Sequence, residues 1–78
     1  HRAMDTFQIP TDALIASPSD TAGVHGIGVL YYGGACAVVT QAGNTVVLPA
    51  VLAGAVIPLM ITKVLLAGTS ATDILVFR

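Results

Sequence analysis

GAVIPLMITKVLLAGTSATDILVF, residues 54–77, is the stretch that decides the fold. It holds two apolar runs rich in β-branched residues, 55–67 and 74–77, separated by residues 68–73. Glycine and short hydroxyl or carboxylate side chains in that separator favour a chain reversal. The pattern predicts that the two runs pair as a β-hairpin.

Neither run alternates cleanly between apolar and polar residues. In a strand, Ile74 and Val76 lie on the face opposite Leu75 and Phe77, so both faces are apolar and both need cover. A single domain of 78 residues buries only about 60% of the surface that its unfolded chain exposes. We therefore expect further copies of the chain to supply the missing cover, which predicts a homo-oligomer.

The composition is unusually poor in charge, with 55% hydrophobic and 9% charged residues, whereas an ordinary soluble domain is about a quarter charged. Between Asp20 and Lys63 there is no charged residue, and the net charge is −1. Such a chain lacks the basic surface that binds nucleic acid or an anionic membrane. We expect neither as a partner.

Two observations bear on the membrane and on export. The longest apolar window, residues 46–61, is shorter than the ~20 residues of a spanning helix and contains Pro49 and Pro58. A small membrane protein is therefore a disfavoured alternative. Residues 1–11 lack the apolar region of a signal peptide, so we expect the chain to be made in the cytoplasm and to stay in that cell until something carries it out.

Two parts are predicted along the chain: an extended N-terminal arm, residues 1–23, and a β-domain, residues 24–78. Pro10 and Pro18 argue against a central strand in the arm. Its apolar residues would anchor it on a neighbouring subunit; the alternative is a frayed terminus. These anchors are Phe7, Ile9, Leu14 and Ile15.

The β-domain begins with a strand candidate at residues 24–32. Alternation would place Gly26 and Gly28 on one face with Tyr32, which suggests a bulge or close packing by another chain. Residues 36–40 and 45–48 form the best local hairpin, because Gly43 and Asn44 suit a tight reversal.

One helical turn is possible in residues 50–55, and Pro58 marks an edge or a bulge before residues 59–67. About six short strands are expected, with turns every 8–12 residues. The predicted fold class is all-β: a small antiparallel sandwich or barrel with an extended N-terminal arm.

Reactive side chains are few and poorly arranged. Ser19, Asp20 and His25 have no nucleophile elbow around them. Cys36 lies in an apolar run, where burial makes a thiol inert, and one cysteine cannot form an internal disulfide. Glycines occur at positions 26, 28, 33 and 34, but the lysine and the following helix of a phosphate-binding loop are missing.

Two histidines with no carboxylate at ligand spacing do not form a metal site within one chain; His1 and His25 of several subunits could meet only on a symmetry axis. We predict no enzyme, no catalytic residue, no cofactor and no metal.

Two further pairs of residues have structural interpretations. Lys63 and Asp73 could pair across the last turn as a solvated ion pair of little energetic weight. Tyr31 and Tyr32 point to opposite faces of their strand, so one should lie in the core and the other at the surface or an interface.

The order of several short motifs resembles small virion proteins of tailed phages and gene transfer agents, most closely the capsid spike-base proteins. These motifs are SPSDT (17–21), VLYYGG (29–34), Gly43 with TV (45–46), AG (53–54), IPL (57–59), KV (63–64) and GTSATDI (68–74). The resemblance covers residues 17–77, and GTSATDI is its most specific part. Two departures are the single basic residue, Lys63, after Pro58, and the more apolar segment 48–51.

The resemblance implies a β-structured protein on the capsid of a virion, as a symmetric oligomer in contact with the major capsid protein or other virion proteins. We expect a structural protein that decorates or cements the head or forms the base of a head spike. A tail or baseplate protein and a small ligand- or glycan-binding β-domain are the alternatives. The expected interface residues are Phe7, Ile9, Leu14, Ile15, Tyr32, Leu65, Leu75 and Phe77.

Overall fold

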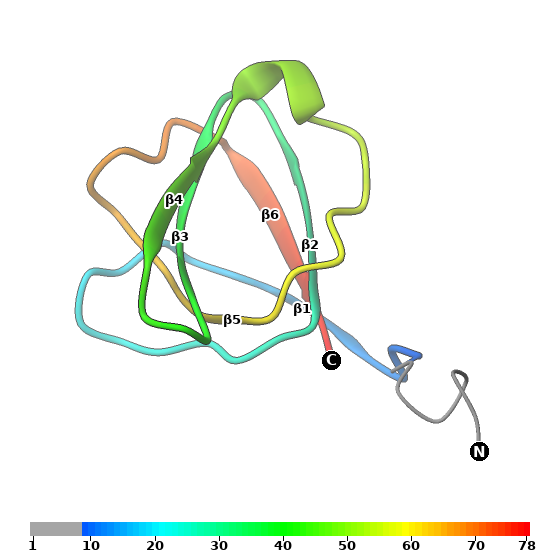
Figure 1. The fold of residues 1–78 in the computed structure, drawn as a ribbon. Helices are drawn as coiled ribbons and strands as arrows, with labels where there is room; N and C mark the ends of the chain where they lie inside the picture. Colours follow the sequence, from blue (N-terminus) through cyan, green and yellow to red (C-terminus); the bar gives the residue numbers. More distant parts are fainter. Residues whose placement is uncertain (1–8) are drawn as a thin grey trace.

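The computed structural model describes residues 9–78, so Phe7 lies outside the described part. Residues 9–78 form six short strands and one turn of 3-10 helix (Figure 1). The elements are β1 (Ala13–Ile15), β2 (Gly28–Tyr32), β3 (Cys36–Thr40), β4 (Thr45–Leu48), η2 (Ala50–Leu52), β5 (Ile61–Val64) and β6 (Asp73–Phe77). The all-β prediction and the single helical turn within residues 50–55 are confirmed.

The strands form two antiparallel sheets of three strands each. Sheet A has the order β1-β6-β2, and sheet B has the order β4-β3-β5. The segment before β2 reaches β5 of sheet B through the bridge Gly26↔Ile61, and the segment before β5 reaches β2 of sheet A through the bridge Val29↔Ile57. The strands of both sheets thus surround one core, as Figure 1 shows. The core is lined by buried apolar side chains from both sheets: Val29, Tyr31, Cys36, Val38, Leu48, Ile61, Val64, Ile74 and Val76.

The hairpin of β3 and β4 is formed as predicted, with Val38 opposite Val46. Gly43 has φ +92°, a left-handed conformation that glycine adopts without strain. Its N–H donates to the carbonyl of Thr40 at 2.9 Å, and the hydroxyl of Thr40 accepts from the N–H of Asn44 at 3.2 Å. The turn residues therefore satisfy one another locally, which is why this hairpin could be predicted.

The hairpin predicted between residues 55–67 and 74–77 is wrong. β5 pairs with β3 in sheet B, whereas β6 lies between β1 and β2 in sheet A. The segment between them, 65–72, crosses from one sheet to the other and bonds to the start of β3. The N–H of Leu65 and the hydroxyl of Thr69 bond to the two backbone groups of Ala37 at 2.8 and 2.9 Å. The start of β3 thus supplies the hydrogen-bond partners that this segment would otherwise have found within a local turn between β5 and β6.

The expectation that Gly26 and Gly28 share a face is also wrong. The N–H of Gly26 donates to Ile61 in sheet B, and the N–H of the next residue, Ile27, donates to Phe77 in sheet A. A Cβ at Gly26 would meet Val76 in the core, while one at Gly28 would touch Phe77. The chain therefore switches faces between these glycines as it passes from one sheet to the other.

Part of the predicted arm belongs to sheet A of its own chain. Residues 13–15 form β1, with Ile15 opposite Leu75. The carboxylate of Asp20 accepts from the N–H groups of Leu66 and Ala67 at 3.0 and 3.2 Å. One edge of β6 is thus filled by residues 13–15 of the same chain, and the docking of the arm on a neighbouring subunit stays a prediction. The boundary at residue 23 stays a prediction.

Candidate functional site

The outer face of sheet A is the side of that sheet turned away from the core. Antiparallel partners carry their side chains on the same face. Leu30 lies opposite Leu75, and Leu75 lies opposite Ile15, so one apolar row crosses all three strands. The outer face of sheet A consists of Ala13, Ile15, Gly28, Leu30, Tyr32, Asp73, Leu75 and Phe77.

A shallow hollow of about 300 Å³ lies on this face, lined by Ile15, Tyr32, Asp73, Ile74 and Leu75. Ile15 is 83% exposed and Tyr32 is 52% exposed. Asp73 contributes the one ionisable carboxylate of the lining, beside the phenol of Tyr32. Such a hollow can accept an apolar side chain of another molecule, with a cationic group beside Asp73.

The structure brings three of the expected interface residues together in this hollow: Ile15, Tyr32 and Leu75. Phe77 lies on the same face, opposite Ala13. Period-two alternation in residues 74–77 was enough to find Leu75 and Phe77. Leu30 and Ala13 were missed, because the register that places them beside Leu75 and Phe77 cannot be read from a single strand.

The remaining expected interface residues lie elsewhere. Leu14 is half-buried opposite Val76, so its side chain is on the core side of β1. Ile9 precedes β1 and is 83% exposed. Leu65 is half-buried in the segment that crosses between the sheets. None of these three residues lines the hollow.

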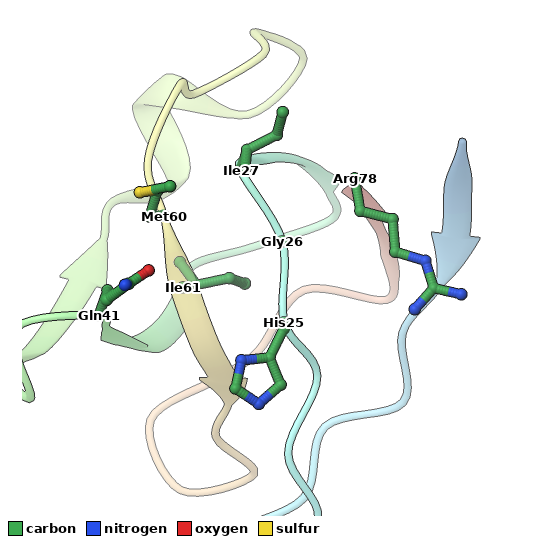
Figure 2. A pocket seen from close by; sticks show the side chains of 7 residues that line it. All are labelled: His25, Gly26, Ile27, Gln41, Met60, Ile61 and Arg78. Carbon is green, nitrogen blue, oxygen red and sulfur yellow. The ribbon is translucent and has the colours of Figure 1, made fainter. Parts of the chain in front are cut away.

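A second hollow, of about 260 Å³, is lined by His25, Gly26, Ile27, Gln41, Met60, Ile61 and Arg78. Figure 2 shows Gln41 and Arg78 on opposite sides of the segment that carries His25. Their polar groups do not converge on one point, as a nucleophile and its base must. This hollow therefore does not have the arrangement of a reaction site.

The core contains two ionisable groups that lie side by side. Burial raises the pKa of the Cys36 thiol. Burial, and next the charge of Cys36, raises the pKa of Tyr31, whose hydroxyl donates to the carbonyl of Pro49 at 2.6 Å. Both residues are 0% exposed, so they are protonated structural groups at neutral pH. Tyr31 is in the core and Tyr32 at the surface, as predicted.

Lys63 and Asp73 lie in different sheets and do not form the pair considered above. The ammonium group of Lys63 donates to the carbonyl of Asp20 at 3.3 Å, and Asp73 accepts from the hydroxyl of Thr72 at 3.4 Å. Within residues 9–78, no three His, Cys, Asp or Glu side chains are grouped closely enough to hold a metal ion. The described residues also include no helix with the length and apolar character to span a membrane.

Comparison with known proteins gives a match of fold. No family model matches the chain, and no curated protein matches it. A chain in a solved structure, the capsid of a native GTA (gene transfer agent) particle computed with C5 symmetry, is similar with a TM-score of 0.77 and 20% identity. The alignment covers 97% of this chain and 95% of that chain. At this identity the similarity shows a shared fold.

Proposed function

We propose that this chain is a structural protein of a phage or gene transfer agent virion, carried on the capsid, with no enzymatic role. In that role it decorates or cements the head or forms the base of a head spike, as a symmetric oligomer bound to the major capsid protein or another virion protein. The observation that carries the proposal is the fold shared with a chain of a GTA capsid over 97% of this chain and 95% of that chain.

The outer face of sheet A supports this role independently. Leu30, Leu75 and Phe77 are all only half-buried, and Ile15 and Tyr32 are more than half exposed. Apolar and aromatic residues gathered on an exposed face are typical of a protein interface. A structural protein that is held permanently in a particle would keep this face covered.

The chemistry of the surface favours a protein partner over a small ligand. The hollow at Leu75 is shallow, and its residues do not enclose a ligand on several sides as binding pockets usually do. A partner loop with an aliphatic side chain next to a lysine or arginine would fit both the apolar floor and Asp73. Such a loop could belong to the capsid protein.

Particle incorporation tests this function. An epitope-tagged copy of the chain would be expressed in the producing cell, and particles would be purified and imaged by electron microscopy with a label on the tag. Label on the head is expected. Label on the tail or baseplate would overturn the capsid assignment in favour of the first alternative, and particles without label would overturn a virion role.

A matched pair of variants tests the surface. Tyr32→Asp places a charge beside the hollow and should reduce incorporation severalfold. Leu66→Asp adds the same charge at a residue that is 60% exposed in the segment between the sheets, and it should be incorporated like the unchanged chain. Equal incorporation of both variants would exclude the outer face of sheet A as the docking surface.

A further inference from the structure

Each sheet has one edge strand whose outer side is free within residues 9–78. In sheet A this strand is β1. The N–H groups of Asp12 and Ala16 donate toward β6, to Arg78 and Ile74, so the alternation of an antiparallel ladder turns the backbone groups of Ala13 and Ile15 outward. The N–H of Ala13 is bonded to the carboxylate of Asp12 at 2.8 Å. The other outward groups of β1 have no partner in the described chain.

In sheet B the free edge is β4. The N–H of Thr40 donates to the carbonyl of Asn44, and this register makes Val46 and Leu48 the residues that bond to β3. The backbone groups of Thr45 and Val47 therefore point away from the sheet. None of the hydrogen bonds formed among residues 9–78 involves those groups.

The other two edges are covered by the chain itself. Beside β2, the N–H groups of Gly54 and Ile57 donate to Tyr31 and Val29. Beside β5, the N–H groups of Val24 and Gly26 donate to Thr62 and Ile61. Only two of the four edges are thus left open in the described part of the chain, one in each sheet.

Neither open edge has a feature that prevents pairing with another strand. Edge strands of soluble proteins are usually protected by lysine, proline, a bulge or a covering segment. The sequences ALI of β1 and TVVL of β4 contain no charged residue and no proline, and the pairing of β4 with β3 is regular. Their side chains are accessible, with Ile15 83%, Val46 37% and Val47 55% exposed.

We propose that β1 of one copy pairs antiparallel with β4 of a second copy, and that this edge pairing joins the subunits. The register in which the outward groups can bond places Ala13 opposite Val47 and Ile15 opposite Thr45, and the N–H of Ala13 then exchanges the Asp12 carboxylate for the carbonyl of Val47. Both pairs then lie on the outer surface of their sheets. Leu14 and Val46, which point to the core side, come to lie opposite each other and cover one another.

A second copy is the partner that this geometry favours, because the two edges complement each other. Pairing of β1 with β1 would leave β4 open in every copy, and pairing of β4 with β4 would leave β1 open in every copy. A head-to-tail contact of β1 with β4 uses both edges of every copy through one type of interface, and such a contact closes into a ring when the rotation permits. The edge pairing rests on the proposed function in one respect: it identifies the surface through which the proposed oligomer would form.

Cysteine cross-linking tests the register. Leu14 and Val46 would form a pair without mutual hydrogen bonds, whose Cα atoms lie ~4.5 Å apart, within the range of about 4.4–6.8 Å that a disulfide spans. A chain with both Leu14→Cys and Val46→Cys should form covalent oligomers larger than dimers on mild oxidation. Cys36, which is 0% exposed, would not take part.

Two controls accompany the double variant. Leu14→Cys alone can link at most two chains. Leu14→Cys with Ala42→Cys places the second thiol at the exposed tip of the β3–β4 turn and should give no larger species than Leu14→Cys alone. If the Leu14→Cys, Val46→Cys chain gives no more high-mass product than this control, the proposed pairing is wrong.

A pair of substitutions that introduce opposite charges tests the same surface without disulfides. Val47→Lys should lower the oligomer fraction, measured by native mass spectrometry, at least tenfold, because a lysine at the edge opposes pairing. Val51→Lys, at a residue that is 86% exposed on η2, should have no effect. Adding Ala13→Asp to Val47→Lys should restore much of the oligomer, since the two charges would face each other across the interface. A Val47→Lys chain that assembles like the original would overturn the proposal.

These measurements use the purified chain, so they are separable from particle incorporation. A chain that cross-links as expected but is absent from particles would retain the interface and lose the proposed function. A chain that is found on the capsid but passes none of the edge tests would retain the function and lose the interface. An unchanged chain that stays monomeric at all concentrations measured would overturn the interface.

Discussion

Gly26→Ala should destabilise the chain strongly, whereas Gly28→Ala, two residues further along, should not. A Cβ at Gly26 would lie 2.8 Å from the carbonyl oxygen of Phe77 and would also meet a methyl group of Val76. A Cβ at Gly28 would have its nearest neighbours at 3.5–3.7 Å, which is ordinary contact. The same methyl group is therefore added once where there is no room and once where there is.

The magnitudes follow from the contacts. Forcing an extra methyl group into a packed site costs about 1–3 kcal/mol, and at Gly26 the obstructing oxygen belongs to the backbone and cannot rotate away. At Gly28, replacing glycine reduces the freedom of the unfolded chain and contributes about 0.4–1 kcal/mol of stability where the backbone conformation allows it. For a domain of this size, each kcal/mol shifts the Tm by about 4–8 °C.

Thermal unfolding by circular dichroism measures the difference. All chains must be compared at one protein concentration, because assembly raises the apparent Tm by mass action. Gly26→Ala should melt several degrees below the unchanged chain, and Gly28→Ala at or slightly above it. Equal Tm values for the two variants would refute the switch of faces between these glycines and the packing of Gly26 against Val76.

Three further predictions concern the core and the outer face of sheet A. Cys36 should resist iodoacetamide at pH 8 until the chain is unfolded, because burial raises its thiol pKa; rapid labelling of the native chain would contradict its burial. Stability should fall as the pH rises above 9, since the raised pKa values of Cys36 and Tyr31 lie above the ordinary 9.0 and 10.0, and groups with raised pKa values stabilise the fold only while protonated. Urea unfolding at pH 7–11 measures this, and Tyr31→Phe should flatten the fall; an unchanged slope would show that Tyr31 ionises without cost. Leu75→Asp should abolish incorporation into particles and leave the isolated fold intact, because Leu75 lies on the outer face of sheet A and outside the core; normal incorporation of this variant would show that this face is open in the particle.

Local chemistry accounts for what the sequence could predict. The β3–β4 hairpin is specified by its own turn, where Gly43 and Thr40 supply the conformation and the hydrogen bonds. The alternation of residues 74–77 correctly placed Ile74 and Val76 in one face and Leu75 and Phe77 in the other. These features depend on residues only a few positions apart.

Long-range pairing accounts for what the sequence could not predict. The turn-like residues 68–73 could have joined β5 to β6, but the carbonyl of Ala35 accepts from Ser70 and Ala71 and draws this segment across to the other sheet. In the same way, β1 is recognisable only beside β6, because three residues carry too little periodicity to indicate a strand. The candidate site was therefore found in part, through Ile15, Tyr32 and Leu75, and its remaining members depended on register.

The central claim is that one copy of the chain cannot cover the outer face of sheet A and both open edges. The mass of the purified chain in solution tests this claim most directly. Sedimentation velocity at micromolar concentration should show a folded species whose mass is two or more times the 7.9 kDa mass of one chain. A folded, soluble species of 7.9 kDa that persists at those concentrations would contradict the claim.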